Sequence, residues 1–199
     1  MSRNAQDPAS STAILQPVKD IILFHHSAIP HVESQYDTVR DYHNRGAPDV
    51  NGKLKWPAGR GIQYSFFIEK SGELIEGNPP ERVTWHSGSW KWNQRAIGIC
   101  LAGDLRTENV TGAQLKTLAG LTRSLQTRFD IPDDHLFNHR DCHATECPGR
   151  DIREMVINEK NKVTTSKIDH LRKAIDRSEP PRKYMLERLL SRLIRLLPL

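Results

Sequence analysis

The segment from Asn138 to Gly149 constrains this chain more than any other, because it concentrates metal-binding side chains in one short turn. Its twelve residues include two histidines, two cysteines and two acidic side chains, and a Pro-Gly pair ends it. Zinc accepts nitrogen and sulfur ligands together, so this composition predicts a zinc site. The chain contains no Cys-x-x-Cys pair, which excludes a zinc finger.

Two candidate ligands, His139 and Cys147, lie eight residues apart, so a loop must fold back for both to reach one ion. A third ligand must come from elsewhere, and the obvious source is the pair His25-His26 after the apolar run 21–24. That run predicts a buried strand, whose end holds a ligand rigidly. Neighbouring strand residues point to opposite faces, so the choice between the two histidines depends on the face of the sheet. Three protein ligands and an open fourth position are typical of catalytic zinc, which lowers the pKa of a bound water to about 7.

Ordered blocks of sequence carry a family resemblance that covers roughly residues 20–160. The chain resembles the zinc N-acetylmuramoyl-L-alanine amidases of the phage-lysozyme type and the animal peptidoglycan recognition proteins. The matching segments are Ile-Leu-Phe-His-His-Ser-Ala at 22–28, the stretch 64–77, Trp-His-Ser-Gly at 85–88, the stretch 93–103, and His-Arg-Asp through Cys-Pro-Gly at 139–149.

The resemblance implies that His25, His139 and Cys147 hold Zn²⁺, which leaves His26 for packing or for support of a ligand. Cys142 stays open as a substitute for Cys147, because it lies in the same turn. The alternative for Cys142 is a small buried side chain.

The resemblance also implies the residues around the metal. Tyr64 corresponds to the tyrosine beside the zinc, whose phenol can donate to the oxyanion. Thr145 falls where the phage enzymes have lysine and the catalytic recognition proteins have threonine. We expect Tyr64 and Thr145 to be catalytic. His86 and Asn93 are expected at the substrate groove. Glu146 is either a base or a solvated loop acid, and the sequence assigns no general base.

Two further features refine the resemblance. The tryptophans near His86 are expected either to contact substrate or to cover the core; they are Trp85, Trp90 and Trp92. The bacterial recycling amidases carry glutamate and aspartate where this chain has Cys100 and Cys147, which disfavours a recycling role.

Hydrophobic periodicity predicts an α/β fold, with a central mixed β-sheet flanked by helices and a C-terminal helical extension. The predicted division is a flexible segment at 1–18, a zinc amidase domain at 19–162 and a helical extension at 163–199. Thr111 and Gln114 form a capping box at the start of the clearest helix. Strands are expected at 20–25, 62–69, 73–76, 96–101 and 136–137, helices at 33–44, 111–130, 151–159, 165–178 and 184–197, and a long loop at 46–61.

The net charge of +5 is concentrated at the C-terminus. Residues 182–199 contain five basic side chains and one acid, which leaves about +1 for residues 1–181. No basic stripe with interleaved aromatics occurs, so nucleic acid is not an expected partner. The segment 184–197 predicts a cationic amphipathic helix, which suits an anionic membrane surface. Docking on the domain or pairing with a second copy is the alternative.

The leading function is a bacteriolytic zinc amidase, such as a phage endolysin, that cuts the bond between N-acetylmuramic acid and L-alanine in peptidoglycan. A module that binds peptidoglycan without cutting it is the alternative, and a partner-binding regulator is a third class. The first twelve residues are polar and lack the apolar centre of a signal peptide. We therefore expect synthesis in the cytoplasm and action on the wall after release. Three cysteines predict no disulfide framework.

Overall fold

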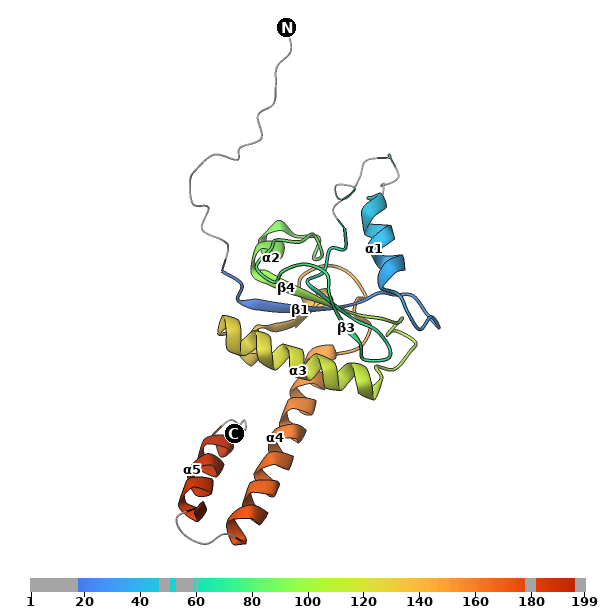
Figure 1. The fold of residues 1–199 in the computed structure, drawn as a ribbon. Helices are drawn as coiled ribbons and strands as arrows, with labels where there is room; N and C mark the ends of the chain where they lie inside the picture. Colours follow the sequence, from blue (N-terminus) through green and yellow to red (C-terminus); the bar gives the residue numbers. More distant parts are fainter. Residues whose placement is uncertain (1–17, 47–50, 53–58, 60, 178–181, 196–199) are drawn as a thin grey trace.

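A mixed five-stranded sheet forms the centre of the molecule (Figure 1). The computed structural model describes residues 18–46, 51–52, 59, 61–177 and 182–195. The strand order is β3-β2-β4-β1-β5, with β1 parallel to β4 and β5, β2 parallel to β4, and β3 antiparallel to β2. This confirms the predicted α/β fold. The strands are β1 (Ile21–His26), β2 (Phe66–Ile68), β3 (Leu74–Glu76), β4 (Ala96–Leu101) and β5 (Leu136–Asn138).

Helices cover both faces of the sheet: α3 and the first part of α4 lie on one face, and α1 and α2 lie on the other (Figure 1). The predicted capping box of α3 is present, with Gln114 N donating to Thr111 Oγ1 and Thr111 N donating to Gln114 Oε1. The helices are α1 (Tyr36–Arg45), α2 (Trp90–Arg95), α3 (Gly112–Phe129), α4 (Ile152–Asp176) and α5 (Arg182–Ile194), with short 3₁₀ helices at Asp133–His135 and His139–Asp141.

All six residues of β1 are buried, and they alternate between the two faces of the sheet. Ile22 and Phe24 join the larger core, which includes Leu118 of α3 and Val156 of α4. Leu23 belongs to a separate cluster on the opposite face. The alternation therefore places His26 on the face covered by α3, and His25 on the face covered by α1.

The helices differ from the prediction in two places. The helix α2 was not predicted, because its six residues are too few to show a periodic pattern. The single helix α4 replaces the two helices predicted at 151–159 and 165–178, since no proline or glycine occurs between them to end it. Most of the predicted loop, the N-terminal segment and the Pro-Pro pair at 180–181 lie outside the described residues. The division into domains remains a prediction.

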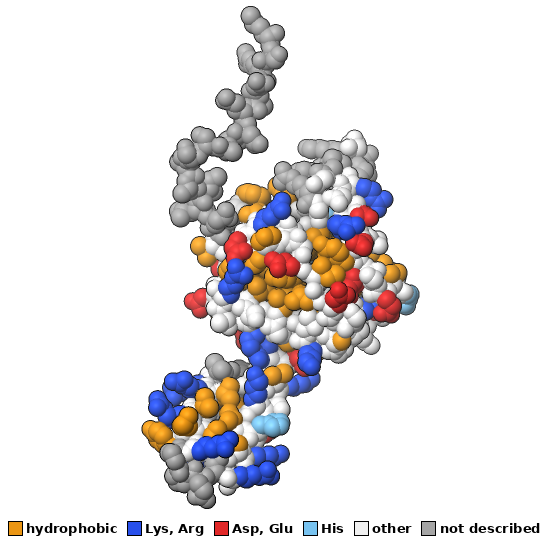
Figure 2. Space-filling model, in the orientation of Figure 1, with side chains coloured by type: hydrophobic (Ala, Val, Ile, Leu, Met, Phe, Trp, Pro, Cys, Tyr) orange, Lys and Arg blue, Asp and Glu red, His pale blue; other side chains and the backbone are white. Residues whose placement is uncertain are grey.

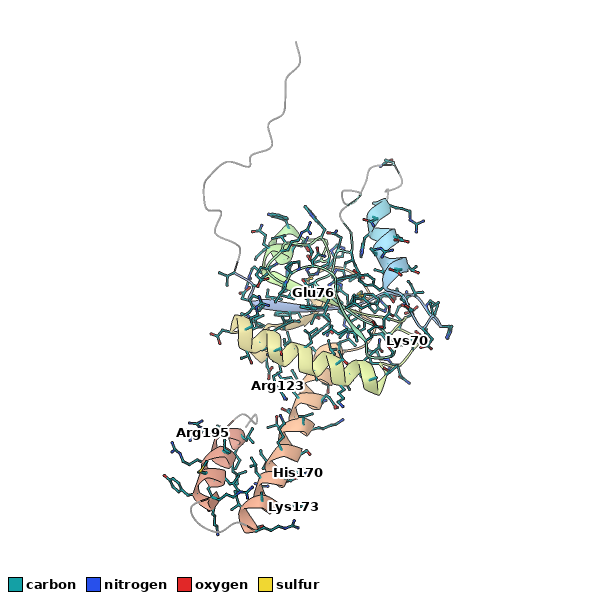
Figure 3. All side chains as sticks on the ribbon, in the orientation of Figure 1. Lys70, Glu76, Arg123, His170, Lys173 and Arg195 are labelled. Atoms are coloured by element: carbon teal, nitrogen blue, oxygen red, sulfur yellow. The ribbon has the colours of Figure 1, made fainter. Side chains whose placement is uncertain are left out.

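The far part of α4 extends beyond the sheet, and α5 folds back along it (Figure 1). We call residues 160–177 and 182–195 the helical hairpin. It carries eleven Lys and Arg and three Asp and Glu, a net charge of +8. Residues 1–159 carry eighteen Lys and Arg and twenty Asp and Glu, a net charge of −2. Figure 2 shows basic side chains gathered on the hairpin, and Figure 3 shows His170 and Lys173 on α4 and Arg195 on α5.

Candidate metal centre and groove

Three side chains distant in sequence converge at one edge of the sheet. His25, His139 and Cys147 each contribute one ligand atom, and these atoms lie within 4.8 Å of one another. The strands β1 and β5 are parallel neighbours, so their carboxyl ends meet at the same edge. His25 lies near the end of β1 and His139 directly follows β5, which brings their ring centroids to 4.5 Å. His25 Nδ1 lies 3.8 Å from Cys147 Sγ.

The loop 139–149 folds back as the ligand spacing requires. Arg140 N donates to the carbonyl of Cys147 at 2.8 Å, and Cys147 N donates to Thr145 Oγ1 at 3.2 Å. Buried Asn138 fixes the start of the loop, because its Oδ1 accepts from Ile152 N at 3.1 Å. These bonds tie the loop to itself and to α4, so Cys147 is held beside the strand ends.

The histidine ligands are held so that the same ring atom of each is directed to the cluster. His25 Nε2 lies 2.9 Å from His86 Nδ1, and His139 Nε2 lies 3.2 Å from the carbonyl of Ser87. Nδ1 of both rings is therefore left for a ligand. Burial lowers the pKa of His25 well below its ordinary value, and the nearby His139 and His86 lower it further. Burial likewise lowers the pKa of His139. Both imidazoles are neutral at pH 7, the form that binds metal.

The structure separates His25 from its neighbour. The His26 ring lies on the face of the sheet opposite to His25, where its Nδ1 accepts a hydrogen bond from Leu105 N at 3.0 Å. The same Nδ1 lies 3.8 Å from a carboxylate oxygen of Asp104. Only the backbone of His26 reaches the cluster, where its N–H donates to Cys147 Sγ at 3.5 Å. Burial raises the pKa of Cys147 to about 12, so its thiolate needs a cation nearby.

The other candidates within the turn lie apart from the cluster. Cys142 donates to the carbonyl of His139 at 3.3 Å and packs against the core beside Phe137. The structure thus brings Cys147, and not Cys142, to the ligand set. Glu146 is exposed and pairs with Arg106 at 3.2 Å, as expected of a solvated loop acid.

Tyr64 lies directly beside the ligands, as the resemblance implies. Its ring centroid is 5.0 Å from that of His25. Burial raises the pKa of Tyr64 well above its ordinary value, so the phenol stays protonated and can donate. Thr145 is half-buried in the loop that carries Cys147, with its hydroxyl accepting the Cys147 N–H.

A pocket of about 390 Å³ opens beside the ligand cluster, and His139 is the ligand that lines it. It adjoins a second pocket of about 360 Å³ bounded by α1, and Tyr42, His43 and Tyr64 line both. The two pockets together form a groove. The first is lined by Tyr42, His43, Tyr64, Trp85, His86, Gly88, Asn93, His139 and His143.

His86 and Asn93 lie at this groove, and both are buried. The Asn93 side-chain oxygen accepts hydrogen bonds from His86 N, Ser87 N and Ser87 Oγ, so Asn93 shapes the groove wall. His86 needs Gly98 beneath it, because a Cβ there would lie 2.9 Å from its ring. Contact of His86 and Asn93 with substrate remains a prediction.

Sequence reasoning missed the other groove histidines. His43 falls within the helix predicted at 33–44 and His143 within the turn predicted to bind metal, but neither was assigned to the groove. His143 stacks on His139, with centroids 5.7 Å apart and an interplanar angle of 13°. The helical spacing of His43 from Val39 is a usable signal, because both side chains are buried on one face of α1. His143 offered none, since its position depends on how the loop folds.

Known proteins share this arrangement of strands and loops. A family model described as N-acetylmuramoyl-L-alanine amidase matches residues 15–150. Peptidoglycan-recognition protein SC2 of Drosophila melanogaster is 28% identical over 145 residues, which are 72% of this chain and 76% of that protein.

Two solved structures show the same fold. The endolysine N-acetylmuramoyl-L-alanine amidase LysCS from Clostridium intestinale URNW is 29% identical and has a TM-score of 0.53, covering 67% of this chain and 76% of its own. Drosophila PGRP-LB is 29% identical and has a TM-score of 0.54, and the match covers 70% of this chain and 81% of that chain. The matched segment contains the strands, the groove and all three candidate ligands, and the chain therefore belongs to the N-acetylmuramoyl-L-alanine amidase family.

Proposed function

We propose that this chain is a zinc-dependent hydrolase of the amide bond between N-acetylmuramic acid and L-alanine in peptidoglycan. The family includes amidases and recognition proteins, so membership alone does not assign catalysis. The observation that carries the proposal is the complete ligand set of His25, His139 and Cys147, converging within 4.8 Å beside a groove.

The donor chemistry fits zinc. Two neutral imidazoles and one thiol are ligands that zinc accepts together, and three protein ligands leave a position for catalysis. The ring partners of His25 and His139 orient both imidazoles, as outer partners do in metal sites. The chemistry that zinc supplies in such a site is a water nucleophile at neutral pH and a polarised carbonyl.

The chain's own residues have separate tasks in this proposal. Tyr64 stays protonated and donates to the oxygen on which negative charge develops. His86 holds the ring of His25 at 2.9 Å and so fixes its orientation. Thr145 accepts the Cys147 N–H and keeps the ligand loop in place, and its hydroxyl hydrogen remains for substrate.

Product analysis distinguishes this function from recognition without cleavage. Purified peptidoglycan incubated with the chain is expected to yield glycan with free lactyl carboxylates and stem peptides with L-alanine amino termini, both identified by mass spectrometry. Binding to the wall with neither product would establish the recognition module instead.

We also propose that the chain acts on the wall after release from the cell that makes it, as an endolysin does. The support is its similarity to a protein named as an endolysine. A phage-type role predicts lysis from outside when purified chain meets cells with permeabilised outer layers, and intact turbidity would contradict it.

The helical hairpin supports a further proposal, that it binds an anionic membrane surface. Tyr184, Met185 and Leu189 are largely exposed on α5, interspersed with Arg188 and Arg192. Exposed apolar side chains among basic ones suit the interface of an anionic lipid layer. No helix among the described residues is long and apolar enough to cross a membrane.

Vesicle binding tests this proposal. Each basic residue near an anionic surface contributes about 1 kcal/mol, so Arg188→Gln/Arg192→Gln should weaken binding to phosphatidylglycerol vesicles by roughly tenfold or more at low salt. The matched control is Lys91→Gln/Lys116→Gln, which removes two exposed charges from the domain. Equal binding by both double variants and the parent chain would end the idea.

A further inference from the structure

Two exposed tryptophans lie side by side at the rim of the groove. Trp85 is 38% exposed and Trp90 is 53% exposed, while their ring centroids are 5.2 Å apart at an interplanar angle of 34°. Large apolar side chains exposed as a contiguous pair indicate an interaction site more often than isolated ones do. Trp85 also lines the pocket that holds His139, so the pair continues the groove.

A third tryptophan shows that this exposure is specific to the pair. Trp92 lies two residues after Trp90 in α2, where it packs edge-on against Phe137 at 5.2 Å and 85°. Trp92 also contacts the apolar cluster of Leu23. The core therefore takes Trp92, whereas Trp85 and Trp90 remain partly exposed at the surface.

The backbone beneath the pair is fixed by hydrogen bonds. Trp85 N donates to Gln63 Oε1 at 3.1 Å, and Ser89 N donates to Ser87 Oγ at 3.1 Å. Asn93 N donates to the carbonyl of Ser89 at 2.9 Å, at the start of the helix that carries Trp90. A surface held in this way loses little conformational entropy when a ligand binds.

We propose that Trp85 and Trp90 form a stacking platform for pyranose rings of the peptidoglycan glycan strand next to the cleaved residue. This inference rests on the proposed function, because a scissile amide at the ligand cluster brings its muramoyl sugar into the same pocket. The following sugars of the strand then have to leave along the groove rim. Indole faces pack against the apolar C–H faces of sugar rings, and an uncharged platform of two rings suits a polymer of amino sugars.

The platform makes the enzyme selective for polymer over fragment. A strand of several sugars contacts both rings, whereas a substrate with a single muramoyl sugar reaches the pocket alone. We therefore expect turnover of intact wall to depend on Trp85 and Trp90 more than turnover of N-acetylmuramoyl-L-alanyl-D-isoglutamine does.

Binding of peptide-free glycan tests the platform directly. The probe is a purified oligomer of alternating N-acetylglucosamine and N-acetylmuramic acid without stem peptides, titrated into the full zinc-loaded chain and followed by calorimetry and tryptophan fluorescence. We expect Trp85→Ala/Trp90→Ala to raise the dissociation constant at least tenfold, and Trp85→Tyr/Trp90→Tyr to restore most of the affinity. Trp92→Phe is the matched control and is expected to bind as the parent does.

The outcomes separate this inference from the proposed function, because the probe lacks the bond between N-acetylmuramic acid and L-alanine. Glycan binding that the alanine variant loses supports the platform, even if the parent chain releases no L-alanine termini. Equal binding by the parent and the alanine variant, both with unchanged circular dichroism, overturns it. A pair that responds to phospholipid vesicles and not to glycan overturns it too, because the occupant would then be a membrane.

Discussion

The amidase domain and the helical hairpin are built on different physical terms. The domain buries apolar side chains on both faces of a sheet and is slightly acidic, with a net charge of −2 over residues 1–159. The hairpin carries +8, and its buried side chains are Ile168 and Ile175, both on α4. Close packing positions reactive groups, whereas exposed charge serves contact with a surface. We therefore expect substitutions in the domain to leave the surface contact of the hairpin unchanged, and substitutions in the hairpin to leave the reactive groups of the domain unchanged.

The sharpest test of this separation is Cys147→Ser, for which we expect the largest effect. The substitution removes the sulfur ligand, and loss of several kcal/mol of metal-derived stabilisation lowers kcat by roughly a thousandfold or more. The measurement is the initial rate of amide cleavage in soluble wall fragments.

Cys142→Ser is the matched control, since Cys142 lies in the same turn but packs against the core. A Cys147 variant that keeps the parent's rate would contradict the ligand assignment. A Cys142 variant that loses activity and zinc together would do the same. Vesicle binding by the hairpin should not change in either variant.

A smaller effect is expected from His86→Phe, which keeps a ring but removes the partner of His25 Nε2. Outer partners of metal ligands typically contribute 10- to 100-fold in metal affinity, so we expect zinc to bind about 10- to 100-fold more weakly. Competition with a chromogenic chelator measures the dissociation constant. An unchanged dissociation constant would show that His86 does not support the metal ligand His25 and only lines the groove.

The third prediction concerns acid. Burial lowers the pKa of both His26 and His43 to about 4, and each Nδ1 accepts a backbone N–H. The unfolded chain binds these protons near pH 6.5 and the folded chain only near pH 4. Stability is therefore full above pH 6.5 and falls as the pH drops toward 4, by about 3 kcal/mol for each histidine.

Thermal melts between pH 7.5 and 4.5 check this, followed by a signal from the domain. In His43→Asn the loss between these pH values should be smaller, because one of the buried histidines that cause it is gone. A melting temperature that stays constant across the range contradicts the prediction. The slope should be unaffected when α5 is altered, which again separates the two regions.

The smallest effect is expected within the hairpin. Leu193 of α5 is half-buried and lines a pocket together with Val163 and Leu171 of α4, so Leu193→Asn should loosen α5 without reaching the sheet. Hydrogen exchange is the measurement: amides of 182–194 should exchange faster, while those of α3 and the sheet keep their rates. Faster exchange in α3 would show that the two regions are coupled.

Much of the domain could be predicted from sequence because its signals are local. The strand 96–101 was predicted with its observed bounds, and the capping residues Thr111 and Gln114 marked the start of α3. The ligand set came from the family resemblance, and the structure brings those three side chains together. The choice between His25 and His26 needed only the alternation along β1, once the covered faces were known.

The remainder depended on contacts between distant segments. Nothing in the sequence pairs His86 with His25, because 61 residues separate them and the two rings meet only in the folded chain. The continuity of α4 was missed, although no proline or glycine interrupts residues 152–176. Likewise Trp85 and Trp90 could not be distinguished from Trp92 before the direction of each ring was known.

The central claim is that one zinc ion, held by His25, His139 and Cys147, enables the chain to cut peptidoglycan. The most direct measurement is release of L-alanine amino termini from purified peptidoglycan by chelator-treated chain, to which zinc is returned in steps. We predict no release without zinc and full recovery at one zinc per chain. Undiminished release from metal-free chain, or no release at any amount of zinc, would contradict the account.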